Sequence, residues 1–278
     1  MTARTESKKA ESTNLRIRVG VGGWTYEPWR DNFYPSDLPQ KQELHYASRH
    51  VTAIEVNGTY YSTMKPESFR KWHDETPDDF VFSLKATRYA TNRKLLASAG
   101  ESVTRFVDSG ITELKDKLGP IVWQFMPTKV FDAEDFAAFL ALLPKRAGSR
   151  TLRHVMDVRH ESFMTDAYLA LARKHGVATV FTDSDKFPSF ANLTSDFAYA
   201  RLMNSDAKLR AGYAPKALTA WAERAQTWSG GSAPDDLPRV DGADDVPAKA
   251  RDVFIFFING AKEKAPAAAG ALIAKLAR

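Results

Sequence analysis

The sequence predicts a single α/β domain, a TIM-type (β/α)8 barrel of eight parallel strands. Eight short segments rich in β-branched or aromatic residues recur along the 278 residues, and stretches with helical periodicity or helix punctuation separate most of them. This alternation is typical of parallel strands joined by right-handed crossovers. An open doubly wound sheet is the alternative, but the glycines at positions 20, 22 and 23 do not match the G-x-G-x-x-G fingerprint of dinucleotide binding.

Local signals place the elements. Pro66 and Pro215 suit the first turn of a helix, where a missing N–H costs nothing. Asp132 is a predicted N-cap for a helix that ends before Pro144, and Gly176 is a predicted C′ residue. The predicted strands are, in chain order, residues 17–21, 51–56, 80–85, 121–125, 154–158, 179–182, 197–202 and 253–258.

The chain divides into a tail and one domain. Residues 1–15 are polar and are expected to form a disordered N-terminal tail, without the apolar core of a secretory signal. Residues 16–278 are the expected barrel. Within it, residues 229–249 are rich in Gly, Pro and Asp and lack periodicity, which indicates a surface loop insertion, a mobile linker rather than an active-site lid.

Composition narrows the classes of function. The chain has no cysteine, which excludes disulfides, thiolate nucleophiles and Cys-ligated metals and favours a cytoplasmic location. No apolar run approaches the roughly 20 residues that cross a bilayer, so no membrane partner is expected. The net charge is +5, but residues 1–18 carry five basic and two acidic residues, so any anion-binding site must be local.

Polar side chains collect at the predicted carboxyl ends of the strands, where barrel enzymes place their chemistry. Such groups are costly on apolar strands unless they pair with each other or face a ligand, and both readings stay open for each residue. For the set we favour a ligand site. The residues concerned are Glu55, Asn57, Lys85, Gln124, Asp157, Arg159, His160, Asp183, Arg201 and Asn259.

The leading hypothesis is an enzyme, a hydrolase, lyase or isomerase, that performs general acid–base chemistry on a phosphorylated or carboxylated small molecule. Catalytic roles fall to Glu55, Lys85 and Asp157, and the first two transfer protons. Arg159 and Arg201 would clamp the anion. The other expected ligand-binding residues are Trp24, Asn57, Tyr61, Gln124, His160, Asp183 and Asn259.

Two alternatives come from other classes. The aromatics Trp24, Tyr26, Tyr60 and Tyr61 follow the first two strands and form either a stacking wall for a sugar or base or a cover over the barrel end. With the basic tail, the first reading predicts a protein that binds or processes nucleic acid. The second alternative is a non-catalytic binding scaffold. Sequence does not determine the oligomeric state.

No cofactor is predicted. There is no G-x-S-x-G elbow, and the six histidines are too dispersed for a multinuclear zinc centre. Carboxylates at the strand ends suit Mg²⁺, but the lysine and arginines in the same ring would compete for them, so a metal is not expected.

Six stretches give the sequence its resemblance to a known family. They are VGVGGWTYEPW (19–29), IEVNGTYY (54–61), FVFSLK (80–85), LGPIVWQF (118–125), DVRHESF (157–163) and FIN (257–259). In this combination the chain resembles the YecE-like family, domain of unknown function 72, from about residue 18 to its end. The resemblance implies a TIM-type barrel and no established reaction.

The chain departs from that family pattern at three positions. Asp157 replaces a longer acidic residue, and Asn92 and Met203 stand where the family has histidines. The resemblance therefore implies either that the family's chemistry does not need these histidines or that this chain has altered or lost activity.

Overall fold

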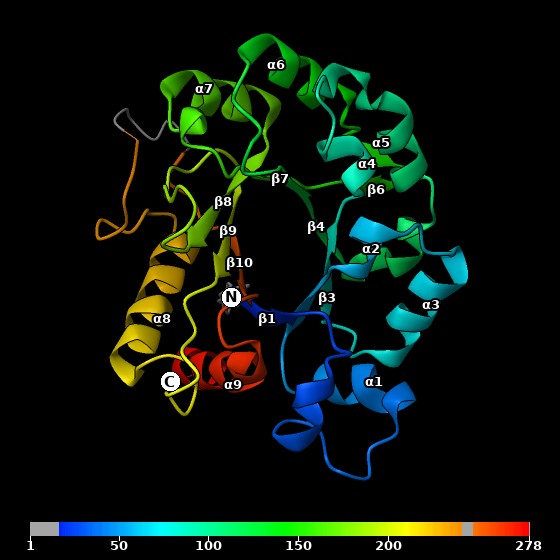
Figure 1. Ribbon diagram of the computed structural model, residues 1–278, viewed down its shortest axis with the longest axis vertical. Coiled ribbons are helices and arrows are strands. Elements are labelled where there is room, and N and C mark those ends of the chain that lie inside the picture. The colour runs from blue at the N-terminus through cyan, green and yellow to red at the C-terminus, as the bar shows by residue number, and fades with distance from the viewer. Residues whose placement is uncertain (1–16, 241–246, 278) are drawn as a thin grey trace, which may run out of the picture.

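The structure is a computed structural model and describes residues 17–240 and 247–277. Its centre is a closed barrel of eight parallel strands in the order β1-β10-β9-β8-β7-β4-β3-β2, surrounded by a ring of helices (Figure 1). The predicted fold class is confirmed. The tail predicted at 1–15 and the middle of the loop predicted at 229–249 lie outside the described residues.

All eight predicted strands are present, with ends displaced by three residues or fewer. The barrel strands are β1 (Ile17–Gly22), β2 (Ala53–Val56), β3 (Val81–Lys85), β4 (Leu118–Gln124), β7 (His154–Asp157), β8 (Ala178–Asp183), β9 (Phe197–Leu202) and β10 (Asp252–Phe257). The α-helices are α1 (Glu43–Ala47), α2 (Gly58–Tyr61), α3 (Pro66–Glu75), α4 (Arg88–Thr91), α5 (Gly100–Val107), α6 (Ala133–Leu142), α7 (Asp166–His175), α8 (Pro215–Ser229) and α9 (Ala265–Leu276).

The predicted helix signals act as expected. Asp132 caps α6 by accepting hydrogen bonds from two backbone N–H groups, each at 3.0 Å. Gly176 ends α7 in the left-handed region with φ of 67°. Pro66 and Pro215 begin α3 and α8.

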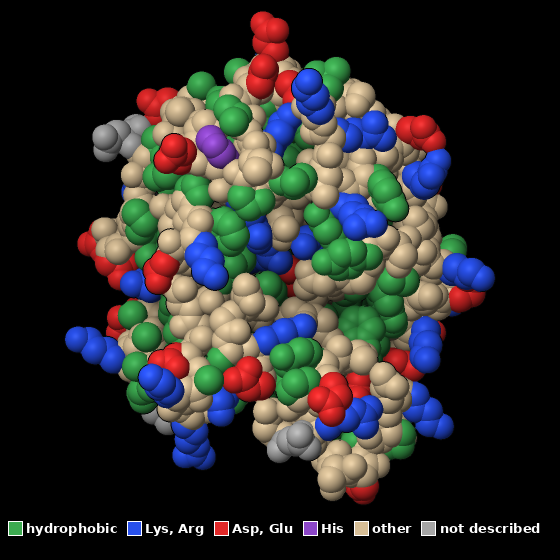
Figure 2. Space-filling view, in the orientation of Figure 1, with side chains coloured by type: hydrophobic (Ala, Val, Ile, Leu, Met, Phe, Trp, Pro, Cys, Tyr) green, Lys and Arg blue, Asp and Glu red, His purple; other side chains and the backbone are tan. Residues whose placement is uncertain are grey.

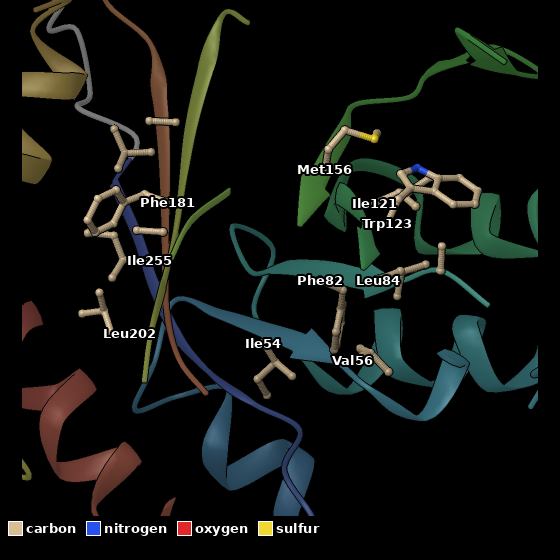
Figure 3. Packing of buried hydrophobic residues seen from close by; sticks show 14 of the residues in the cluster. Ile54, Val56, Phe82, Leu84, Ile121, Trp123, Met156, Phe181, Leu202 and Ile255 are labelled. Carbon is tan, nitrogen blue, oxygen red and sulfur yellow. The ribbon is translucent and has the colours of Figure 1, made fainter. Parts of the chain in front are cut away.

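Strand alternation divides the buried residues into two sets. Phe82, Leu84 and Trp123 point from their strands toward the surrounding helices, where most of the core lies (Figure 3). The neighbouring positions, such as Val122 and Tyr199, fill the barrel itself. Inward positions recur every second residue along a strand. Residues 83 and 85 of β3 and residues 199 and 201 of β9 therefore face the same barrel interior, where the candidate site lies.

The structure adds two features to the predicted outline. A short antiparallel pair, β5 (Arg146–Ala147) and β6 (Arg150–Thr151), precedes β7 outside the barrel and was not predicted. Part of the predicted loop insertion contacts the loop after β8. Asn192 binds the backbone of Val240 through both ends of its amide, and the Pro238 carbonyl accepts from the Ala191 N–H. These bonds join residues 238 and 240 to the loop after β8, and the mobility of the insertion stays a prediction.

Across the described residues, no helix is both long enough and apolar enough to span a bilayer.

Candidate functional site

Arg201 on β9 is the centre of a buried charge cluster at the carboxyl end of the barrel. Its Nη2 donates to Glu55 Oε1 at 2.7 Å, and its Nη1 donates to Asp157 Oδ2 and, at 2.9 Å, to Gln124 Oε1. The side chains of Arg201, Glu55 and Asp157 are at most 1% exposed. These residues come from β9, β2, β7 and β4, so closure of the barrel creates the cluster.

A polar layer beneath the cluster holds Glu55. Tyr199, two residues before Arg201, donates its hydroxyl to Glu55 Oε2 at 2.8 Å. Ser83 Oγ lies 2.8 Å from the same hydroxyl and donates to the Pro120 carbonyl. Burial and the Glu55 carboxylate raise the pKa of Tyr199 well above its usual range, so Tyr199 remains a donor. Both Glu55 oxygens are therefore engaged.

Arg159 covers the outer side of Asp157. Its Nη2 donates to Asp157 Oδ2 at 2.9 Å and to Gln124 Oε1 at 3.0 Å, and its guanidinium lies 4.4 Å from the centre of the Phe187 ring. Burial acts to raise the pKa of Asp157, but Arg159 and Arg201 outweigh it and lower that pKa, so the carboxylate stays ionised. The Arg159 side chain is 13% exposed, and its Nη1 makes no hydrogen bond within the described chain.

Lys85, at the end of β3, has a different environment. It is 7% exposed, and its Nζ lies 4.0 Å from the centre of the Tyr60 ring. Among residues 17–240 and 247–277, no carboxylate or other acceptor hydrogen-bonds this amine. Burial, then the charge of Arg201, lowers the pKa of Lys85 to about 8. The Tyr60 hydroxyl donates to Asn92 Oδ1 at 3.3 Å.

The cluster holds two carboxylates, two guanidiniums and one amine. The carboxylates are saturated by the arginines and Tyr199, and the surplus positive charge resides on Lys85 and the outer edge of Arg159. Figure 2 shows a hollow at the centre of the molecule where Lys and Arg side chains gather. A positively charged recess of this kind attracts anions.

Two residues predicted for the ligand site lie elsewhere. Asp183 is one position past Thr182, which pairs with Arg201 in register, so Asp183 faces the other side of β8. There it accepts from the Tyr213 hydroxyl at 3.1 Å, and burial raises its pKa. Trp24 packs edge-on against Trp72 of α3 with ring centroids 5.2 Å apart, and therefore forms part of the outer cover.

Four further predicted residues lie around the rim. Asn57 directs its Nδ2 toward the Glu55 carbonyl at 3.4 Å. His160 caps a short 3-10 helix, η5 (Glu161–Phe163), by accepting from the Ser162 N–H. Asn259 is exposed after β10, and Tyr61 is 60% exposed. None of the four hydrogen-bonds the charged side chains within the described residues.

The structure adds residues that the predicted site lacked. Tyr199 and Ser83 were detectable, because each lies two positions before a predicted site residue on the same strand and therefore shares its face. Tyr60 was predicted to belong to an aromatic wall or cover, and its position beside Lys85 was not predicted. Phe187 carries no sequence signal, since only the path of the loop after β8 brings it over Arg159.

The donor set does not suit Mg²⁺. Each oxygen of Glu55 and Asp157 already accepts from an arginine or from Tyr199. A hard cation would have to displace these donors and would meet two guanidiniums beside it. No group of three His, Asp or Glu residues in the described chain is arranged to hold a metal ion.

Comparison with known proteins gives a family match. Residues 18–278 match the family model described as "Protein of unknown function DUF72". The chain is 26% identical to the UPF0759 protein YecE of Escherichia coli K12 over 147 residues, 53% of this chain and 50% of that protein. It is 26% identical to the UPF0759 protein YunF of Bacillus subtilis over 116 residues, 40% of each. These matches span half or less of the curated relatives.

Solved structures show the same fold. A DUF72 family protein from Thermotoga maritima superposes with a TM-score of 0.69 at 22% identity, covering 94% of this chain and 98% of that one. One from Enterococcus faecalis also gives 0.69 at 17% identity, covering 94% and 96%. At these identities the likeness concerns the barrel alone.

Proposed function

The chain belongs to the family of proteins of unknown function DUF72, and we propose a function from its own site: an enzyme that binds a small phosphorylated or carboxylated molecule at the barrel mouth and transfers a proton with Lys85. The observation that carries this proposal is the uncompensated charge. The cluster contains one more cation than carboxylates, and that cation is an amine without an acceptor in the described structure.

The roles differ in part from those predicted. Arg201 was expected to clamp the anion, but it is 1% exposed and engaged with two carboxylates and Gln124. In this proposal Arg201, Glu55 and Asp157 position the neighbouring groups. Arg159 binds the anion through Nη1, the part of its guanidinium that hydrogen-bonds nothing described, while its other nitrogens keep it oriented on Asp157.

Lys85 is suited to proton transfer because its pKa of about 8 lies near physiological pH. An ordinary lysine, with a pKa near 10.4, would remain charged throughout catalysis. The neighbouring Tyr60 ring accommodates the protonated form, since a cation over an aromatic face is stabilised by the ring quadrupole.

The test compares two arginines on opposite ends of one strand. Arg159 follows β7 at the mouth, and Arg153 precedes β7, where it pairs with Asp252 at 2.6 Å. Calorimetric titration with inorganic phosphate and with pyruvate is expected to show binding to the unmodified protein. Arg159→Met should weaken it by about 10- to 100-fold, the value of a charged hydrogen bond, and Arg153→Met should not. Equal affinity in both variants would contradict the proposal.

One specific observation favours a second candidate function, nucleic-acid binding. Tyr61 and Tyr89 are each 60% exposed at the rim, and the Arg88 guanidinium lies 5.7 and 5.5 Å from their ring centres. Exposed rings beside a guanidinium form a stacking platform for bases. Salt-dependent oligonucleotide binding that is lost in a Tyr61→Ala, Tyr89→Ala variant would favour this candidate; absence of binding at low ionic strength would remove it.

A further inference from the structure

Lys85 differs from two other buried or half-buried lysines, Lys117 and Lys129, in what surrounds its amine, and like Lys262 it lies beside an aromatic ring. Lys117 donates to two backbone carbonyls, at 2.5 and 2.7 Å, and Lys129 pairs with Asp135 at 2.8 Å. Lys85 contacts an aromatic face. Burial and the charge of Arg201 lower its pKa, the charges of Glu55 and Asp157 raise it, and Arg159 lowers it further. Of Lys85, Lys117 and Lys129, Lys85 is therefore the one whose amine donates no hydrogen bond within the described chain.

The nearby carboxylates accept no hydrogen bond from this amine in the described chain, and the charges of Glu55 and Asp157 only partly offset the effects of burial and Arg201 on its pKa. Both oxygens of Glu55 accept charged or hydroxyl donors, and so do both oxygens of Asp157. With a pKa of about 8, the amine carries a free lone pair in about a tenth of the molecules at pH 7 and in about half of them at pH 8. A desolvated lysine next to another cation is the arrangement that activates this side chain as a nucleophile toward carbonyl groups.

We propose that Lys85 forms an iminium ion with an aldehyde or ketone that carries a carboxylate or phosphate. This inference rests on the proposed function and specifies its substrate class: the anion lies on Arg159 and the carbonyl carbon reaches Lys85 Nζ.

The chemical step balances without an oxidant or reductant. The Nζ lone pair of the neutral amine bonds to the carbonyl carbon, and the C=O π electrons move to oxygen. One amine proton passes to that oxygen to give a carbinolamine. A second proton from solvent converts the hydroxyl to water, the C–O bond breaks, and the nitrogen lone pair forms C=N. The products are an iminium that keeps one N–H and one water molecule.

The site also suits the product. An iminium carries its positive charge at the former amine position, so the Tyr60 ring stabilises it as it stabilises the ammonium. Lys85 is 7% exposed, which limits hydrolysis by water. An electron-withdrawing iminium promotes proton loss or bond cleavage at the adjacent carbon, and this is consistent with the lyase and isomerase classes.

The experiment traps the iminium by reduction. The full chain is incubated at pH 8 with pyruvate or dihydroxyacetone phosphate and sodium cyanoborohydride, and adducts are located by intact-mass and peptide mass spectrometry. The demanding control is Lys262, whose Nζ lies 4.4 Å from the Tyr26 ring centre and whose pKa burial also lowers. We expect one adduct per chain at Lys85, formed about tenfold faster than at Lys262. Lys85→Arg should abolish it and Lys262→Arg should leave it unchanged.

The outcomes separate the two proposals. If phosphate and the carbonyl probes bind and Arg159→Met weakens that binding, but neither probe modifies Lys85 faster than Lys262, the iminium is refuted and the proposed anion site stands. If nothing binds and nothing is trapped at Lys85, both proposals fail. A Lys85 adduct that inorganic phosphate suppresses supports both.

Discussion

Replacing Lys85 by Met should stabilise the protein at neutral pH. The pKa of Lys85 is about 8, against 10.5 in its ordinary state, so charging this amine costs more in the folded protein than in the unfolded chain. At about 1.4 kcal/mol per pKa unit, the penalty is about 3 kcal/mol. Loss of the cation–π contact with Tyr60 offsets about 1 kcal/mol. The net expectation is a gain of about 2 kcal/mol.

The pH dependence of the unfolding free energy tests this reasoning more directly. Between about pH 8 and 10.5 the unfolded chain holds a proton on Lys85 that the folded protein has lost. The free energy of unfolding of the unmodified protein should therefore rise with pH in this range relative to Lys85→Met. The advantage of the variant is full below pH 8 and shrinks through this range.

Urea denaturation at pH 7 and at pH 10 measures both effects. Lys129→Met is the matched control, since it removes the partner of the buried Asp135 carboxylate and should destabilise the protein. If Lys85→Met lowered the unfolding free energy at pH 7, or if its effect did not change between the two pH values, the reasoning about the amine would be refuted.

Three other substitutions test the remaining parts of the structure. His154 is buried, its Nδ1 accepts from Trp123 Nε1 at 3.0 Å, and burial lowers its pKa to about 4. The unfolding free energy should fall by up to about 3 kcal/mol as pH drops from 6.5 to 4, because in this range the unfolded chain binds a proton that the folded protein does not. His154→Gln should flatten that pH profile. Arg201→Met removes the ion-pair partner of the buried Glu55 and one of the two arginines on Asp157, and should cost about 3–5 kcal/mol in urea titrations. A loss below about 1 kcal/mol would contradict this account of the cluster. Gly20→Ala would place Cβ 2.0 Å from the Ala53 carbonyl oxygen, so thermal unfolding should show a large loss of stability. The control is Gly270→Ala, whose Cβ would have no neighbour within 4 Å in the described chain, and it should be neutral or stabilising.

The tertiary structure gives different environments to two arginines that the sequence does not distinguish. Arg201 and Arg159 look equivalent in sequence, since both lie at or near strand ends. In the barrel, the Arg201 side chain is 1% exposed within the charge cluster, whereas the Arg159 side chain is 13% exposed. Glu55, Asp157 and Arg201 form the ion pairs of the predicted self-satisfied cluster, and the predicted ligand site beside them stays a prediction.

The sequence by itself determined the order of strands and helices, because each depends on local periodicity, capping and proline or glycine punctuation. It also placed Glu55, Lys85, Asp157 and Arg201 at strand ends, and a barrel brings such ends together. Only the tertiary structure decided which charges pair, since register and the inward or outward face of each strand set the partners. Asp183 lies outside the cluster by a single residue. Within residues 17–240 and 247–277, Lys85 forms no ion pair, because arginines and a tyrosine occupy both carboxylates.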